Sequence, residues 1–245
     1  MTPGGTLGPH TRETAYAALF ARISEGLLGD PSTPLTFQRV VERAREVVPG
    51  CEGAGITLRG RGRSSESTVA ATSELAQEAD RLQYELDEGP CLDSARGSSD
   101  ATTLVSGDLR HEERWPAWAD SVTRLGVRSV LSIRLHTEVE NIGALNLYSR
   151  TTKAFGDESV ELAEIYAIHA TSVLSQARLV TGLRTALESR HDIGVAQGVL
   201  AVTYDISYEQ AFELLRRISN DTNTKLRDVA RQVLSERGLP AALLH

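Results

Sequence analysis

Residues 186–238, ALESRHDIGVAQGVLAVTYDISYEQAFELLRRISNDTNTKLRDVARQVLSERG, contain three successive helical patterns joined by very short segments. In each pattern apolar residues return every three to four positions, which is typical of an amphipathic helix. Ser207 and Gln210 have the spacing of a capping box at the start of the second helix. Gly238 and Pro240 end the third helix, because glycine and proline both terminate helices well. The stretch therefore predicts a small three-helix bundle, a pattern that by itself indicates no function.

The residues of this bundle resemble the ANTAR family of small three-helix RNA-binding domains. Members of this family are associated with binding tandem RNA hairpins in nascent transcripts, which prevents a downstream terminator from forming. The resemblance thus implies a tandem RNA stem-loop as the partner. Gln197 departs from the family pattern, which often has Lys there, and so lacks one phosphate contact that Lys would offer. The resemblance rests on Ala186, Arg190, Ile193, Ala196, Gln197, Gly198, Leu200, Ser207, Ala211, Phe212, Leu215, Arg216, Ser219, Asn223, Thr224, Lys225, Leu226, Asp228, Val229 and Ala230.

Polar side chains on all three helices are candidates for an RNA-binding face. Asn223 and Lys225 sit at a helix start, where free backbone N–H groups favour a phosphate. Tyr204 and the flat guanidinium of Arg190 are candidates for stacking on loop bases. Gly198 would let an RNA backbone approach closely. The alternative is a solvated surface, with Asn223 only capping a helix and Gly198 permitting helix packing. The predicted RNA-binding residues are Arg190, His191, Gln197, Gly198, Tyr204, Arg216, Asn223, Lys225 and Arg227.

Charge is distributed unevenly along the chain, which has 245 residues and a net charge of −7. Eight Lys or Arg and eight Asp or Glu follow residue 180, so the C-terminal segment is neutral and the first 180 residues carry the negative charge. An acidic surface repels nucleic acid, so the N-terminal part is not expected to bind RNA. Recognition by the neutral segment must rest on a local cluster and on base contacts.

Residues 12–156 alternate helical patterns with short strands, which indicates an α+β domain around a central antiparallel sheet. Residues 1–11 are predicted to be a flexible leader. Helices are predicted at 12–28, 36–48, 73–85 and 115–125, and strands at 51–58, 67–72, 102–105, 129–135 and 141–148.

Three segments of this domain resemble the GAF family, which has a PAS-like sensory fold: EGPCLDSAR at 88–96, RWPAWADSVTRLGVRSVLSIRL at 114–135 and IGALNLYS at 142–149. Arg134 departs from the family pattern, which often has Pro at this strand end. GAF domains often hold a small molecule between the sheet and its covering helices, so the resemblance implies a small-molecule ligand. The alternative is that the apolar candidates are only core residues. The expected pocket residues are Ile56, Leu58, Tyr84, Cys91, Trp118, Ile133 and Leu145.

Residues 157–182 are predicted to form a helical coiled-coil linker between this domain and the bundle domain at 183–240. No proline or paired glycine interrupts the helical pattern here. Apolar residues at heptad spacing favour a two-stranded coiled coil. We therefore expect a parallel homodimer through the linker. The heptad positions are Tyr166, Val173, Val180, Leu183 and Leu187, with His169 and Gln176 between them.

Other classes of protein are not indicated. The sequence has no P-loop, dinucleotide-binding glycine fingerprint or nucleophile elbow, so we expect no enzyme activity, catalytic residue or cofactor. The six histidines are scattered singly, so no metal site is expected. Two cysteines, no export signal and no apolar run of membrane length indicate a cytoplasmic protein with reduced thiols and no membrane partner.

The two resemblances together imply a transcription antitermination regulator, in which a GAF-like sensor is joined to an ANTAR-like RNA-binding domain. Two alternatives remain open. The first is a ligand-sensing regulator that acts through a protein partner, which the neutral C-terminal segment favours. The second is a DNA-binding helix-turn-helix regulator, because three short helices also suit that motif.

Overall fold

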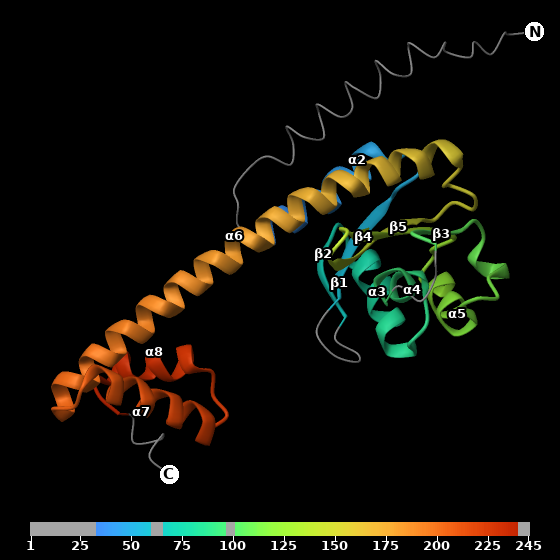
Figure 1. Ribbon diagram of the computed structural model, residues 1–245. Helices are drawn as coiled ribbons and strands as arrows, with labels where there is room; N and C mark the ends of the chain where they lie inside the picture. Colours follow the sequence, from blue (N-terminus) through green and yellow to red (C-terminus); the bar gives the residue numbers. More distant parts are fainter. Residues whose placement is uncertain (1–32, 60–65, 97–100, 240–245) are drawn as a thin grey trace, which may run out of the picture. The chain divides into compact units, whose positions relative to one another are not determined.

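The computed structural model describes residues 33–59, 66–96 and 101–239. The chain forms two compact units that divide after Arg178. One long helix, α6 (Asp157–Tyr204), contributes to both units (Figure 1). No helix in the described ranges is both long and apolar enough to cross a membrane. The predicted leader at 1–11 and the predicted helix at 12–28 lie outside the described residues.

The first unit is built on a five-stranded sheet with the strand order β2-β1-β5-β4-β3 (Figure 1). All four strand pairs are antiparallel, which confirms the predicted α+β class. Besides the start of α6, the elements of this unit are α2 (Thr33–Val47), β1 (Gly53–Leu58), β2 (Ser67–Ala71), α3 (Glu74–Leu86), α4 (Pro90–Arg96), β3 (Thr103–Ser106), the 3-10 helix η1 (Leu109–His111), α5 (Pro116–Arg124), β4 (Ser129–His136) and β5 (Asn141–Ser149).

Helices cover both faces of this sheet. In Figure 1, α2 and α6 lie on one side of it, and α3, α4 and α5 lie on the other. Successive residues of a strand point to opposite faces, so each strand serves both sides. Ile56, Ile133 and Leu145 belong to the core against α2 and α6. Their polar neighbours along the strands, Thr57 and Asn146, hydrogen-bond with side chains of α3.

The first part of α6 packs on the sheet through residues that the sequence assigns to the heptad. Tyr166 is fully buried, and its hydroxyl donates a hydrogen bond to the Val40 carbonyl at 2.7 Å. Val173 is half-buried against the same core. A buried ring cannot contact a second chain, so the heptad prediction is wrong at its first position, Tyr166. The exposed apolar positions of this heptad are Val180, Leu183 and Leu187.

The second unit is a bundle of the end of α6 with α7 (Tyr208–Asp221) and α8 (Leu226–Glu236). Each helix presents an apolar stripe to a shared core, as the periodicity predicts. Side chains packed in this core stabilise the fold because their apolar surface is removed from water. The fully buried residues are Ala196, Leu200, Ala211, Leu215, Val229, Ala230 and Val233.

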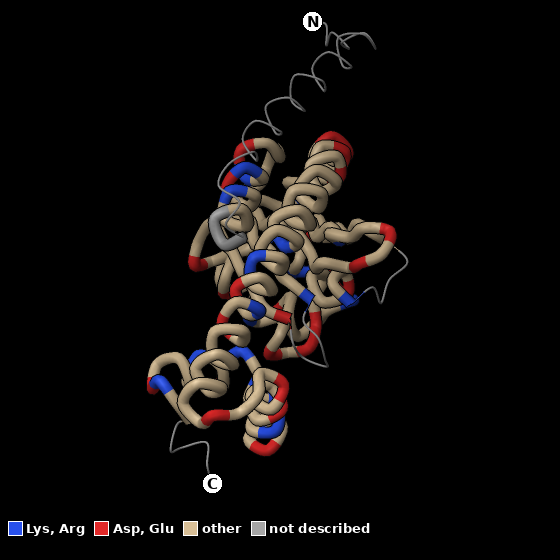
Figure 2. The backbone as a smooth tube through the Cα atoms, turned by 60° about the vertical axis from the view of Figure 1, so that its left-hand side comes forward, with Lys and Arg blue, Asp and Glu red and all other residues tan. Residues whose placement is uncertain are grey.

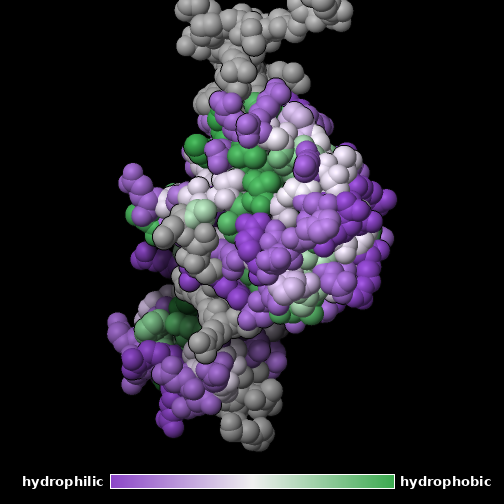
Figure 3. All heavy atoms as spheres, turned by 90° about the vertical axis from the view of Figure 1, so that its right-hand side faces the viewer, coloured by the Kyte–Doolittle hydropathy of each residue, from purple (hydrophilic) through white to green (hydrophobic). Residues whose placement is uncertain are grey.

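The surface of the second unit mixes charged and apolar residues. Figure 2 shows Lys and Arg interspersed with Asp and Glu along its helices. On the face seen in Figure 3, hydrophobic atoms of this unit line a hollow among hydrophilic residues. The unit therefore has no uniformly basic face in these views, in agreement with its neutral charge.

Candidate functional site

A tight turn between α6 and α7 fixes the start of α7. Asp205 has a left-handed φ of 50°. The Ser207 hydroxyl accepts a hydrogen bond from the Gln210 backbone N–H at 3.2 Å, and the Gln210 side chain accepts one from the Ser207 N–H at 2.8 Å. The predicted capping box is therefore formed. Tyr208 ties α7 back to α6, because its hydroxyl donates to the Gly194 carbonyl at 2.8 Å.

The turn between α7 and α8 presents polar groups at a helix start. Asn223 has a left-handed φ of 50°, and the Ser219 hydroxyl donates to the Thr224 carbonyl at 2.6 Å. Lys225 is the N-cap residue of α8 but makes no side-chain capping bond. Asn223 and Lys225 are both exposed. The first turn of α8 thus has an exposed cation, Lys225, that favours a phosphate, beside a carboxylate, Asp228, that opposes one.

The nine predicted RNA-binding residues all reach solvent but lie at separate places on the bundle. Six are exposed, and Gln197, Gly198 and Arg227 are half-buried. Gln197 lies beside the start of α7, where its amide donates to the Tyr208 carbonyl at 3.3 Å. Tyr204 lies beside the end of α8, and its hydroxyl accepts from the Leu239 N–H at 3.1 Å. Their role in RNA binding stays a prediction.

Ion pairs divide the basic residues of the second unit into two sets. Arg216 pairs with Glu213 at 2.7 Å, and Arg231 pairs with Asp192 at 2.9 Å. Arg217 and Arg227 also have acidic neighbours, at 3.5 and 3.6 Å. Exposed pairs of this kind are worth only about 0–1 kcal/mol, so they yield readily to a stronger anion. In the described part of the second unit, residues 179–239, the Lys and Arg side chains that form no ion pair are Arg184, Arg190, Lys225 and Arg237.

The seven expected pocket residues are divided between the two faces of the sheet and do not line one common cavity. Strand alternation explains the division, because the four predicted pocket residues on β1, β4 and β5 occupy alternate strand positions that all point toward α2 and α6. Leu58, Ile56, Ile133 and Leu145 belong to that side. Tyr84, Cys91 and Trp118 belong to the opposite side, with α3, α4 and α5.

A hydrogen-bonded polar cluster occupies that opposite side, under the sheet. The Asp80 carboxylate of α3 accepts hydrogen bonds from Tyr148 at 2.5 Å, from Asn146 at 2.9 Å and from Thr68 at 3.1 Å. The predicted pocket residues include only Tyr84 and Cys91 of this cluster. The signal available in the sequence was the single polar residue within each apolar strand pattern, Thr57 in β1 and Asn146 in β5. We call this polar cluster the Asp80 cluster, and its members are Thr57, Thr68, Asp80, Tyr84, Cys91, Asn146 and Tyr148.

Burial controls the protonation of this cluster. Desolvation raises the pKa of Asp80 to about 6, and hydrogen bonds from Tyr148, Thr68 and Asn146 oppose that rise. Burial also raises the pKa of the Cys91 thiol, whose Sγ donates to the Thr57 hydroxyl at 2.8 Å. Cys91 is therefore a protonated thiol inside the fold and not a reactive thiolate.

The EGPC segment at 88–91 joins α3, α4 and α5. Gly89 has a φ of 138°, and a Cβ there would lie 2.1 Å from the Gln83 side-chain oxygen. That oxygen accepts the Cys91 N–H at 2.8 Å. The Glu88 carboxylate accepts backbone N–H groups at the start of α5, from Ala117 at 2.9 Å and from Trp118 at 3.2 Å. The motif thus has a structural explanation in this chain.

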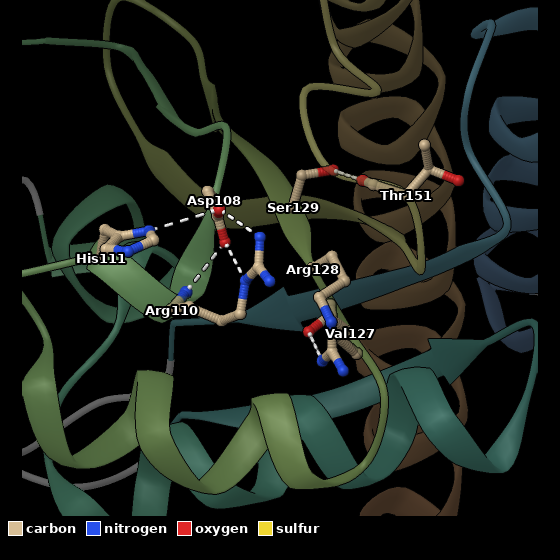
Figure 4. Close-up of polar contacts among 7 residues, drawn as sticks. All are labelled: Asp108, Arg110, His111, Val127, Arg128, Ser129 and Thr151. Carbon is tan, nitrogen blue, oxygen red and sulfur yellow. Dashed lines mark hydrogen bonds and ion pairs between the residues drawn. The ribbon is translucent and has the colours of Figure 1, made fainter.

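A second polar cluster, at the end of β3, is local and exposed (Figure 4). Asp108 accepts hydrogen bonds from the Arg110 guanidinium at 2.7 and 2.9 Å and from the Arg110 N–H at 3.1 Å. His111 lies 3.3 Å from the same carboxylate, whose pKa the Arg110 hydrogen bonds lower. Nearby, Arg128 donates to the Val127 carbonyl at 3.0 Å. These contacts cap η1 and satisfy each other, so they offer no binding site.

Comparison with solved structures shows the fold of the first unit in other proteins. The GAF domain of a phosphoenolpyruvate-protein phosphotransferase from Coxiella burnetii is 15% identical, with a TM-score of 0.53, over 68% of this chain and 96% of that one. The free methionine-R-sulfoxide reductase from Neisseria meningitidis is 13% identical, with a TM-score of 0.53, over 74% of this chain and 98% of that one. At these identities the likeness concerns the fold alone. Comparison with curated proteins found no match.

Two family models match the chain. The GAF domain model matches residues 34–175, which hold the sheet and its covering helices, and the ANTAR domain model matches residues 181–234, which hold the three-helix bundle. A GAF domain is a sensor domain, and an ANTAR domain is an RNA-binding antitermination module. The chain therefore belongs to the GAF domain family and carries an ANTAR domain at its C-terminal side.

Proposed function

We propose that the chain is a homodimeric transcription antitermination regulator that binds two stem-loops of a nascent transcript. The observation that carries this proposal is the ANTAR match over residues 181–234. Arg190 and Lys225 support it, because they are exposed cations that form no ion pair within the described residues and can contact RNA phosphates. The protein acts by binding RNA in the cytoplasm, without catalysis, a cofactor or a membrane.

An exposed apolar row on α6 supports the dimer. Val180, Leu183 and Leu187 are 42, 58 and 69% exposed. Their spacing of three and four residues places them on one side of the helix. A β-branched residue at one seam position and Leu at the next favour two parallel strands in a coiled coil. A second copy of the chain would remove these side chains from water.

The GAF domain supplies the control in this proposal. Its last helix is α6, and the same helix continues into the ANTAR domain. A small ligand that changes the packing of α6 on the sheet would change the alignment of the two α6 helices in the proposed dimer. Two weakly binding domains gain avidity only when their geometry permits simultaneous engagement of both stem-loops. A change in the pairing of α6 would therefore switch RNA binding on or off.

The test is binding of the purified chain to an RNA with two stem-loops, in a salt series. Single stem-loop RNA and duplex DNA of equal length serve as comparisons. Loop-base recognition by a dimer gives tighter binding to the double stem-loop and a shallow dependence on salt. Equal, steeply salt-dependent binding to all three nucleic acids would refute the proposal, and so would no binding at all.

One second candidate function has a specific observation in its favour. The second unit is neutral, and four of its arginines have acidic neighbours at 4.0 Å or less. A protein partner on the helical tail would suit such a surface better than a polyanion would. Capture of one protein by the purified chain after nuclease treatment, together with no RNA binding, would favour this function. Preferential binding to duplex DNA would instead favour a helix-turn-helix regulator.

A further inference from the structure

An open apolar groove lies in the second unit between α6 and α8. Its volume is about 760 Å³, which falls in the roughly 300–1,000 Å³ range of ligand pockets. Val202 is 86% exposed and Val195 is 42% exposed, so aliphatic side chains are left in water here. The core residues Leu200 and Val233 of the same two helices are, by contrast, fully buried. The groove is lined by Val195, Gly198, Val199, Val202 and Thr203 of α6, by Leu234 of α8 and by Arg237, which follows α8.

Arg237 places a cation at this groove. It is the C-cap residue of α8, with a φ of 55°, and its backbone N–H donates to the Val233 carbonyl. Its guanidinium forms no ion pair within the described part of the chain. Arg231, two turns earlier on the same helix, pairs with Asp192 at 2.9 Å. Arg237 is therefore the arginine of α8 that remains available to an anion from outside.

We propose that this groove receives an unpaired base of an RNA loop, with the phosphate of that nucleotide on Arg237. The proposal rests on the proposed RNA-binding function and deepens it by naming a base subsite. A base presents two flat apolar faces, which suit the apolar wall of the groove. The phosphate of the same nucleotide is an anion that can pair with the guanidinium of Arg237. Proteins read splayed loop bases by stacking them against aromatic or apolar side chains. The groove offers both an apolar wall and the matching cation.

Gly198 allows the groove to be filled without disturbing the bundle. A Cβ built on Gly198 meets no atom within 4 Å, so this position in the groove lining has open space for the start of a larger side chain. Leucine is also a better helix former than glycine. The Gly198→Leu chain is therefore expected to unfold at a temperature no lower than the wild-type chain, although its groove is occupied.

The matched control is Gly182→Leu. Gly182 lies on the same helix and also meets no atom within 4 Å of a built Cβ, but it does not line the groove. The probe is a two-stem-loop RNA enriched by the wild-type chain from a pool with randomised loops. We expect Gly198→Leu to weaken binding of this probe roughly tenfold or more, because a stacked base is lost. Gly182→Leu should bind as the wild type does.

Abasic substitutions then identify the base that enters the groove. At one loop position, removal of the base should weaken wild-type binding as much as Gly198→Leu does. The Gly198→Leu chain should bind that abasic RNA only slightly more weakly than the wild-type chain does, because both changes remove the same contact. Arg237→Gln should weaken binding and also make it less dependent on salt, as loss of one phosphate contact does.

The outcomes separate this inference from the function on which it rests. If the wild-type chain enriches no RNA, the antitermination proposal fails and the base subsite fails with it. If an enriched RNA binds the wild-type and Gly198→Leu chains equally well, only the base subsite is overturned. A change in molar mass by light scattering in the Gly198→Leu chain would also overturn it, since the groove would then be a contact between copies.

Discussion

Asp80 is a buried acid whose stability contribution depends on pH. Its pKa is raised from 3.8 to about 6, because desolvation outweighs the three hydrogen bonds that it accepts. Between these values the folded chain binds more protons than the unfolded chain does. The contribution of Asp80 is therefore fully present below pH 3.8 and is lost as the pH rises through 6. A rise of this size corresponds to a contribution on the order of 3 kcal/mol.

We predict that Asp80→Asn removes this pH dependence. The free energy of unfolding of the wild-type chain, relative to the variant, should fall as the pH is raised from 4 to 7. Urea unfolding followed by tryptophan fluorescence measures it, because both tryptophans, Trp115 and Trp118, lie in the first unit. Asp120→Asn, at an exposed position, is the control. Parallel pH profiles for the wild-type and Asp80→Asn chains would contradict the assignment.

The choice of pocket residues shows what sequence reasoning misses at this scale. The alternation in β1 and β5 is readable, and it correctly indicates that Ile56 and Leu145 are core residues. It does not say which face of the sheet carries the polar cluster. Thr57 and Asn146 lie next to these core positions in the chain and point to the other face. Asn146 donates to Asp80 and Thr57 bonds with Tyr84, both on α3, and local periodicity carries no information on these contacts between separate elements.

At the scale of elements, Glu88 acts as the cap of a helix to which it does not belong. The N-cap residue of α5, Trp115, makes no side-chain capping bond. The Glu88 carboxylate accepts the N–H groups of Ala117 and Trp118 instead. A carboxylate at this end of a helix is also favoured by the helix dipole. The loop before α4 thereby holds the start of α5 in place.

Removal of this cap should loosen the start of α5. We predict that Glu88→Ala lowers the free energy of unfolding by about 1–2 kcal/mol, the usual cost of a lost cap. Glu88→Gln keeps an accepting oxygen, so its free energy of unfolding should fall by less than half as much as that of Glu88→Ala. Tryptophan emission should shift in the alanine variant, because Trp115 and Trp118 flank the capped turn. Glu113→Ala, in the exposed segment before α5, should behave as the wild-type chain; an equal loss there would argue against a specific cap.

Most elements can be predicted from periodicity and turn residues, because the apolar stripe of a helix or the alternation of a strand lies within the element itself. The strands, α3, α5 and the three helices of the bundle are of this kind, and so is the capping box at Ser207. Helix α4 is different, since its seven residues are too short for a helical repeat to be evident. Contacts from elsewhere hold it: the Gln83 side chain accepts the Cys91 N–H, and Arg96 pairs with Glu66 at 3.1 Å.

At the scale of the whole molecule, α6 serves two purposes along its length. Its first part is a core element of the GAF domain, where Tyr166 and Leu174 are fully buried. The exposed apolar residues Leu183 and Leu187 then lie on one side of the helix, before the first fully buried residue of the ANTAR core, Ala196. The heptad pattern in the sequence includes Tyr166 together with Leu183 and Leu187, because core and interchain contacts repeat at nearly the same period. Only burial in the folded chain distinguishes them.

This division allows dimerisation and folding to be separated by mutation. We predict that Leu183→Glu with Leu187→Glu leaves the circular dichroism spectrum unchanged, because both side chains are 58% or more exposed in the single chain. Four carboxylates placed against each other in a pair of helices should instead abolish the dimer, which light scattering measures. Affinity for a two-stem-loop RNA should then fall to that for a single stem-loop, since only linked sites gain avidity. Val139→Glu, at a 95% exposed position of the GAF domain, should change neither quantity. A variant that is monomeric yet still prefers two stem-loops would show that one chain recognises both, and the dimer would have no role in recognition.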